Sequence, residues 1–126
     1  MGGDLTGSVT VALDIGTIYV QGDITRTATI EATNGNIGSI IATGSIGAVG
    51  LPHDHTITAG GTIGLVQAYG AGGIWSNITA TGAATWGVGQ VLAYMGDVNG
   101  QINATNGGVY YVYSAVSYTH LRAHET

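Results

Sequence analysis

Two histidines separated by one residue, His53 and His55, are the closest approach to a metal-binding motif in the chain. Side chains two positions apart on an extended segment point the same way, so both imidazoles could contact one ion. A metal site needs a third or fourth ligand, and Asp54 would face the opposite side. The preceding Pro52 is typical of a loop or an edge insertion. The sequence therefore predicts a polar loop, with His53 and His55 as weak candidates for metal ligands.

Aromatic side chains are the second kind of residue with a binding chemistry, because sugars stack on exposed rings. Tyr111 and Tyr113 alternate with Val112 in the last apolar segment, and Trp75 lies in an earlier one. These three aromatic residues are the chosen candidates for a carbohydrate contact, from a wider set that could line the same strip and also includes Tyr69, Trp86, Tyr94 and Tyr110. Aromatic rings also close the cores of β-proteins and are common on strands. Core packing or strand propensity is therefore the favoured interpretation of these residues.

Carboxylates that could perform acid–base chemistry are spread singly along the chain, at Asp4, Asp14, Asp23, Glu31, Asp54 and Asp97. A glycosidase needs two carboxyl groups within about 5 to 10 Å of each other. The chain has two basic residues, Arg26 and Arg122, and no lysine that could assist. We therefore expect no catalytic residues, no enzyme activity and no cofactor.

Composition restricts the class of protein. The chain has 126 residues, a formal net charge of −5, 23 glycines and no cysteine. This length suits one domain at most, and the absence of cysteine excludes disulfides and thiolate metal sites. The acidic balance argues against nucleic acid or an anionic membrane surface as a partner. No apolar run is long enough for a membrane-spanning helix, and no signal peptide is visible at the N-terminus.

A repeated motif organises the sequence that must position these side chains. The pattern Ile-x-Ala, then Thr or Gly, then Asn or Gly, is followed by a short apolar segment, and it begins at Ile30, Ile57, Ile78 and Ile102. The intervals are roughly two dozen residues, and their unequal lengths suit a solenoid whose corner loops tolerate insertions. Gly22-Asp23-Ile24 and Gly96-Asp97-Val98 are a second echo, each shortly before a copy of the motif.

These repeats predict an all-β fold, a right-handed parallel β-helix of about four to five rungs. Stacked rungs place the four isoleucines in one inward column, the alanines Ala32, Ala59, Ala80 and Ala104 in a second, and Glu31, Thr58, Thr79 and Asn103 in an outward column. A left-handed helix would need a strict six-residue period, which is not seen. An antiparallel sandwich remains an alternative, but it gives no reason for the motif to recur.

Two stretches outside the motif also carry predictions. Strict alternation from Leu5 to Val20 predicts one half-buried strand, with Val9, Val11, Leu13 and Ile15 on the same side. From Ile37 to Val49, glycines at positions 38, 44 and 47 divide the apolar residues, which indicates short strands separated by glycine corners.

The final segment, residues 116–126, breaks every regularity of residues 1–115. It resembles the conceptual translation of a transposase-type sequencing adapter, whose preceding bases also complete the codon of Ala115. This resemblance implies a non-native tail on a truncated reading frame from shotgun data. His120 and His124 are therefore excluded as functional candidates, and residues 1–115 form the expected solenoid fragment.

The Gly-x-Ile-x-x-Ile and Ile-x-Ala-Thr-Gly/Asn-Gly pieces resemble the repeats of large bacterial surface or secreted β-helix proteins, including the passenger regions of autotransporter-type adhesins. The resemblance covers residues 5–115 and brings no active-site motif with it. It implies a structural or adhesive segment of an extracellular or cell-surface bacterial protein, with glycans or other cell-surface components as partners and its own adjoining rungs as neighbours. The alternative is the non-catalytic part of a carbohydrate-active β-helix protein, a polysaccharide-binding protein, lyase or hydrolase whose active rungs lie elsewhere.

Overall fold

Three parallel sheets make up the computed structural model, which describes residues 4–25, 28–47, 56–82, 86–99, 101–114 and 118–119. The first sheet contains β1 (Val9–Val11), β3 (Ile30–Ala32), β6 (Thr56–Ala59), β9 (Asn77–Ala80) and β12 (Ile102–Ala104). The second contains β2 (Ile15–Val20), β4 (Ile37–Ala42), β7 (Ile63–Ala68), β10 (Trp86–Ala93) and β13 (Gly108–Ser114). The third contains β5 (Ile46–Gly47), β8 (Ile74–Trp75), β11 (Val98–Asn99) and β14 (Tyr118–Thr119). No helix occurs within the described ranges.

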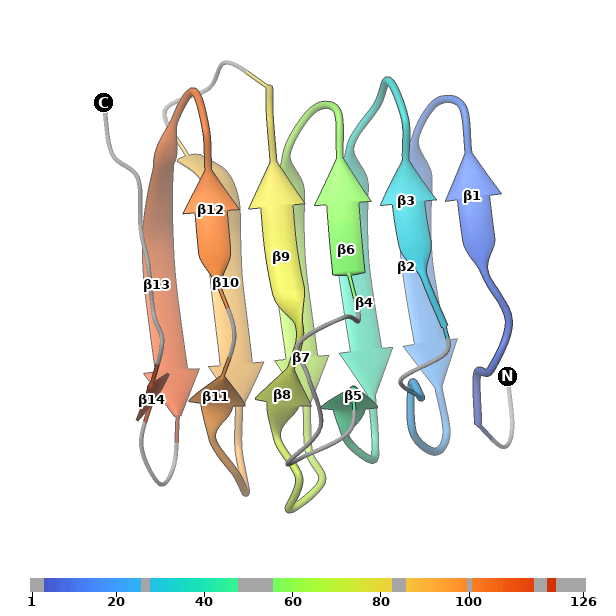
Figure 1. Cartoon of the computed structure of the whole chain (residues 1–126), viewed down its shortest axis with the longest axis vertical. Coiled ribbons are helices and arrows are strands. Elements are labelled where there is room, and N and C mark those ends of the chain that lie inside the picture. The colour runs from blue at the N-terminus through green and yellow to red at the C-terminus, as the bar shows by residue number, and fades with distance from the viewer. Residues whose placement is uncertain are drawn as a thin grey trace.

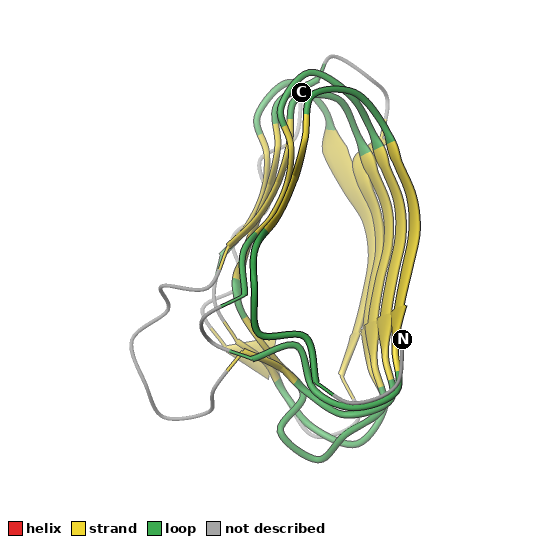
Figure 2. Cartoon of the chain, turned by 90° about the vertical axis from the view of Figure 1, so that its right-hand side faces the viewer, coloured by secondary structure: helices red, strands yellow, loops and turns green. Residues whose placement is uncertain are grey.

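The chain visits the sheets in turn, so the first two sheets collect one strand from each of five coils and the third sheet collects one from each of the last four. In Figure 1 the chain rises through the first sheet on the near side, descends through the second on the far side and advances away from β1, which is a right-handed path. Figure 2, viewed along the stack, shows successive coils superposed in a closed, elongated outline. The predicted parallel β-solenoid is confirmed, because every strand pair is parallel.

Identical residues stack directly over one another in the core. Ile30 pairs with Ile57, Ile57 with Ile78 and Ile78 with Ile102, and each of these side chains is at most 1% exposed. The predicted alanine column and the predicted outward column follow the same register. Both inward columns are therefore confirmed. Each isoleucine buried in this way contributes roughly 1.5 to 3 kcal/mol of hydrophobic stabilisation.

The first coil differs from the strand predicted for Leu5 to Val20. Val9 pairs with Ile30 and Val11 with Ala32 in the first sheet, whereas Ile15 begins a strand of the second sheet. Leu13 lies in the corner between them and is 67% exposed. The single-strand prediction was wrong because alternation continues by chance through a corner. A period of two does not show where a strand ends.

A further inward column runs along the third sheet and continues into the first coil. Leu5 bridges to Ile24, Ile24 bridges to Ile46, Ile46 pairs with Ile74, and Ile74 pairs with Val98. Ile24 and Val98 therefore occupy equivalent positions in different coils. This is the physical reason for the repeated Gly-Asp-apolar echo in the sequence.

Side-chain oxygens connect the coils at the residue before each buried corner position. Asp23 Oδ1 accepts the backbone N–H of Ser45 at 2.8 Å, and Asn36 Oδ1 accepts that of Thr62 at 2.8 Å. Asp4, Asp14 and Asn77 make the equivalent bonds to Asp23, Asn36 and Gln101. Corner N–H groups are outside the strand ladders, so these acceptors satisfy donors that would otherwise depend on water.

Replacing Asp23 with alanine tests this arrangement. We expect Asp23→Ala to lower the free energy of unfolding by about 1 kcal/mol, because the Ser45 N–H loses its acceptor. Asp23→Asn keeps one oxygen in the same place and should cost less than half as much. Urea unfolding followed by circular dichroism measures both variants. Equal losses in the two variants would show that the carboxylate acts in some other way.

Glycines occupy two positions in the third-sheet corner where the backbone is left-handed. Gly47 has φ of +81° and Gly73 has φ of +68°, a region that disfavours side chains. Gly47 ends β5 and is therefore a strand residue, whereas Gly44 does lie in the corner between β4 and β5, as predicted. Gly38, also expected at a corner, instead lies inside β4.

Candidate functional site

The outer face of the second sheet carries no charged side chain. None of its five strands contains Asp, Glu, Lys, Arg or His. Along each strand three positions form core columns, and the remaining positions form outward columns. One outward column contains Thr17, Ser39, Leu65, Gln90 and Tyr111. The next contains Tyr19, Ile41, Gln67, Leu92 and Tyr113.

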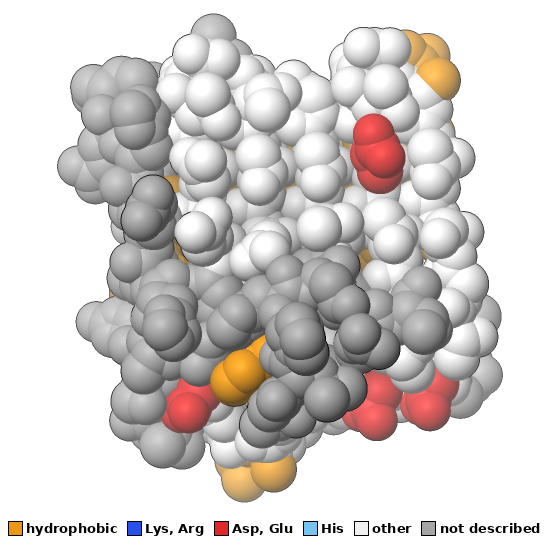
Figure 3. All heavy atoms as spheres, in the orientation of Figure 1, with side chains coloured by type: hydrophobic (Ala, Val, Ile, Leu, Met, Phe, Trp, Pro, Cys, Tyr) orange, Lys and Arg blue, Asp and Glu red, His pale blue; other side chains and the backbone are white. Residues whose placement is uncertain are grey.

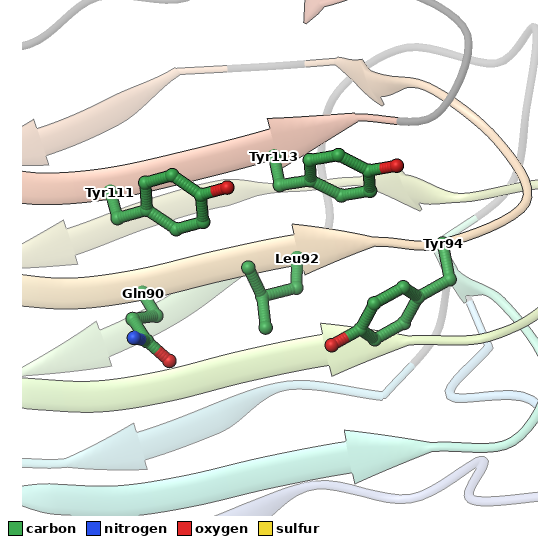
Figure 4. Close-up of a pocket in the computed structure, with 5 residues that line it drawn as sticks. All are labelled: Gln90, Leu92, Tyr94, Tyr111 and Tyr113. Atoms are coloured by element: carbon green, nitrogen blue, oxygen red, sulfur yellow. The ribbon is translucent and has the colours of Figure 1, made fainter.

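A shallow hollow of about 350 Å³ opens on this face at the C-terminal end of the stack. Its lining residues come from β10, β13 and the residue that follows β10: Gln90, Leu92, Tyr94, Tyr111 and Tyr113. Figure 4 shows the rings of Tyr111 and Tyr113 side by side along β13, with their hydroxyls pointing the same way. Leu92 lies between Tyr113 and the ring of Tyr94, whose hydroxyl points into the hollow.

Neighbouring aromatic rings support the hollow. Tyr94 stacks on Tyr69 of the preceding coil, with ring centroids 5.0 Å apart and planes 16° apart. Its other neighbour is Tyr113, with centroids 6.0 Å apart and planes tilted by 48°. The Gln67 side-chain amide donates a hydrogen bond to the Tyr69 hydroxyl. Tyr94 is thus held between two rings on successive coils.

The structure brings together two of the three aromatic residues singled out from the sequence. Tyr111 and Tyr113 share the hollow, and they are 47% and 40% exposed. The favoured interpretation was core packing or strand propensity; the exposure of both rings contradicts core packing, whereas their position on β13 agrees with strand propensity. Trp75 lies in the third sheet, on β8, and does not line the hollow.

Sequence reasoning missed Gln90 and Leu92 as members of the site, and it included Tyr94 only in the wider set of aromatic residues that could line a carbohydrate-binding strip. The signal that could have found them is register. Gln90 pairs with Tyr111 and Leu92 with Tyr113, so aligning the coils places these four side chains in adjacent positions. The Ile-x-Ala motif lies in the first sheet, so its repetition does not show which side chains of the second sheet are neighbours.

Residues that could bind a metal ion form no cluster in the described parts of the chain. No three His, Cys, Asp or Glu side chains there are close enough to hold an ion. Three of the aspartates accept backbone N–H groups of the next coil. His53 and His55 lie outside the described residues. Figure 3 shows that the described part of the opposite face, over the first sheet, consists mostly of backbone and uncharged polar side chains, drawn in white, with few carboxylates.

Comparison with known proteins gives no further guide to this surface. No helix among the described residues is long and apolar enough to cross a membrane. No family model, curated protein or solved structure matches the chain.

Proposed function

We propose that this chain is a rigid structural and adhesive segment of a bacterial exported or cell-surface protein, without catalytic activity. The repeat pattern that resembles secreted β-helix proteins supports this assignment. The low charge of the chain, its lack of cysteine and the regular stacking of its coils suit a protein whose stability comes from contacts between repeats. The extracellular location is part of the same proposal.

One observation supports the structural half of the proposal: the inward columns keep their register from coil to coil, although a bulge between Trp86 and Val88 shifts the pairing of β10 with β13 at the start of the strand. Every inward column of the first two sheets runs through all five strands, from β1 to β12 and from β2 to β13. Backbone groups of each coil pair with those of the next, and the corner acceptors add further bonds. A chain held in this way exposes few extended segments that a protease could bind.

Limited proteolysis tests the rigidity. An enzyme that cleaves after aromatic residues meets several exposed tyrosines on this chain. We expect the described stretches between residues 4 and 114 to resist cleavage for hours under native conditions, whereas the same stretches are cut rapidly in urea. Fast native cleavage after Tyr69 or Tyr94, inside the stack, would contradict a rigid structural role.

The tyrosine-lined hollow favours a second candidate function, the polysaccharide-binding part of a carbohydrate-active β-helix protein. Glycans or other cell-surface components are the proposed partners in either case. Incubation of soluble polysaccharides with the natural protein that contains this chain, followed by a reducing-end assay, separates the two. The adhesive proposal predicts no new reducing ends, and their appearance would favour the carbohydrate-active candidate.

A further inference from the structure

We propose that the hollow lined by Tyr111, Tyr113, Tyr94, Leu92 and Gln90 is a binding site for a neutral glycan, an uncharged polysaccharide chain. This inference rests on the adhesive function proposed above and narrows it to one site and one class of ligand. Three features of the described structure carry it: the charge of the face, the chemistry of the lining and the support of the rings.

Charge selects against acidic ligands. The five strands of the second sheet contain no Lys, Arg or His that could pair with a carboxylate or a sulfate. The whole chain is negative, with a formal net charge of −5. A polyuronate or a sulfated glycan would lose hydration on this face without gaining a partner, and it would be repelled at long range. Cationic polymers would find no carboxylate there.

The lining matches a ligand that has both apolar faces and hydroxyl groups. Tyr111 and Tyr113 are two residues apart on one strand of a parallel sheet, so their Cα atoms are about 6.6 Å apart. Their exposed rings form an apolar platform. The Gln90 amide and the tyrosine hydroxyls each donate and accept hydrogen bonds. Sugar rings present C–H groups to such a platform and hydroxyls to such polar groups. A purely apolar ligand would leave the Gln90 amide and the tyrosine hydroxyls without hydrogen-bond partners.

The aromatic support reduces the cost of binding. Tyr94 is already packed between Tyr69 and Tyr113, at centroid distances of 5.0 and 6.0 Å. A side chain ordered before binding loses little rotamer entropy when the ligand arrives. Rigid aromatic residues in such places dominate the binding energy of many interfaces.

Direct binding measurements with defined polymers test the proposal. Titration calorimetry would use soluble neutral oligosaccharides of glucose, xylose and N-acetylglucosamine, with oligogalacturonate as the acidic probe. We expect at least one neutral series to bind. The affinity should change less than twofold between low and physiological salt, and oligogalacturonate should bind at least tenfold more weakly.

Three variants locate the site. Tyr111→Ala and Tyr113→Ala should each weaken binding by tenfold or more. Tyr19→Ala is the matched control, because Tyr19 is 45% exposed and occupies the same outward column as Tyr113 at the other end of the sheet. It should bind as the unmodified chain does. Circular dichroism confirms that each variant remains folded.

The alternative outcomes separate this inference from the broader function. Preference for oligogalacturonate, or neutral binding that survives both tyrosine changes, overturns the site while leaving an adhesive role intact. Protease resistance without any glycan binding overturns the adhesive role as well and leaves only the structural one. Self-association in sedimentation that Tyr111→Ala abolishes, without glycan binding, would assign the face to a second copy of the chain and overturn the proposal.

Discussion

Gly64→Ala is expected to destabilise the solenoid by about 3 kcal/mol, although Gly64 lies on the exposed side of its strand. A Cβ placed on Gly64 would come within 2.5 Å of the carbonyl oxygen of Gly38 in the preceding coil. That oxygen belongs to the backbone, so relief requires the two coils to move apart. Urea unfolding followed by circular dichroism measures the loss.

The matched control lies in the same column of glycines. Gly16 lies beside Gly38 in the first coil, because the residues on either side of the two glycines are paired. A Cβ added to Gly16 meets no atom within 4 Å. Gly16→Ala should be neutral or should stabilise the chain by up to about 1 kcal/mol, because alanine restricts the unfolded chain. A similar loss in both variants would mean that the glycine column serves something other than the close approach of coils.

Ile57→Ala is expected to lower the free energy of unfolding by about 2 to 5 kcal/mol. Ile57 is 0% exposed and is stacked between Ile30 and Ile78, both also fully buried. Removing its side chain leaves a cavity that neighbouring coils cannot fill without breaking their own register. The same unfolding experiment gives the value.

Two further variants test whether the size and the burial of the removed side chain determine this loss of stability. Ile57→Val removes one methylene group and should cost about 0.5 to 1.5 kcal/mol. Leu13→Ala removes a side chain that is 67% exposed and should change stability by less than about 0.5 kcal/mol. A large effect at Leu13, or none at Ile57, would place the core elsewhere.

The first sheet could be predicted from the sequence because its motif repeats identity as well as pattern. Isoleucine and alanine recur at fixed positions, and a column tolerates only residues that fit the width of the coil there. The register of β3, β6, β9 and β12 therefore followed directly from aligning the repeats. Val9 and Val11 escaped this alignment because valine replaces both motif residues in the first coil.

The second sheet was harder to predict because the two outward columns that line the hollow vary freely. Tyr19, Ile41, Gln67, Leu92 and Tyr113 occupy one column and share no chemical property. These side chains do not enter the core, so core packing does not restrict which residue types occupy the column. The sequence therefore shows no repeat at these positions. The same freedom allows a binding surface to form, and the candidate site lies where the repeat carries no information.

Tyr94 illustrates the remaining gap. It lies one residue beyond β10, in the turn toward the third sheet, where coil length varies. Its ring stacks on Tyr69 only because both residues directly follow an inward alanine, Ala93 or Ala68, which are paired. Sequence alignment of the corners would have required knowing where each strand ends.

Disulfide trapping between outward residues tests the in-register parallel stack most directly. The chain has no cysteine of its own, and Thr58 pairs with Thr79 across β6 and β9. Neighbouring strands are about 4.8 Å apart, within the range that a disulfide can bridge. We predict that Thr58→Cys/Thr79→Cys oxidises rapidly under native conditions and that Thr58→Cys/Thr81→Cys, displaced by two residues, does not. Equal oxidation of the two pairs, or faster oxidation of the displaced pair, would contradict the stacked register on which the proposed function rests.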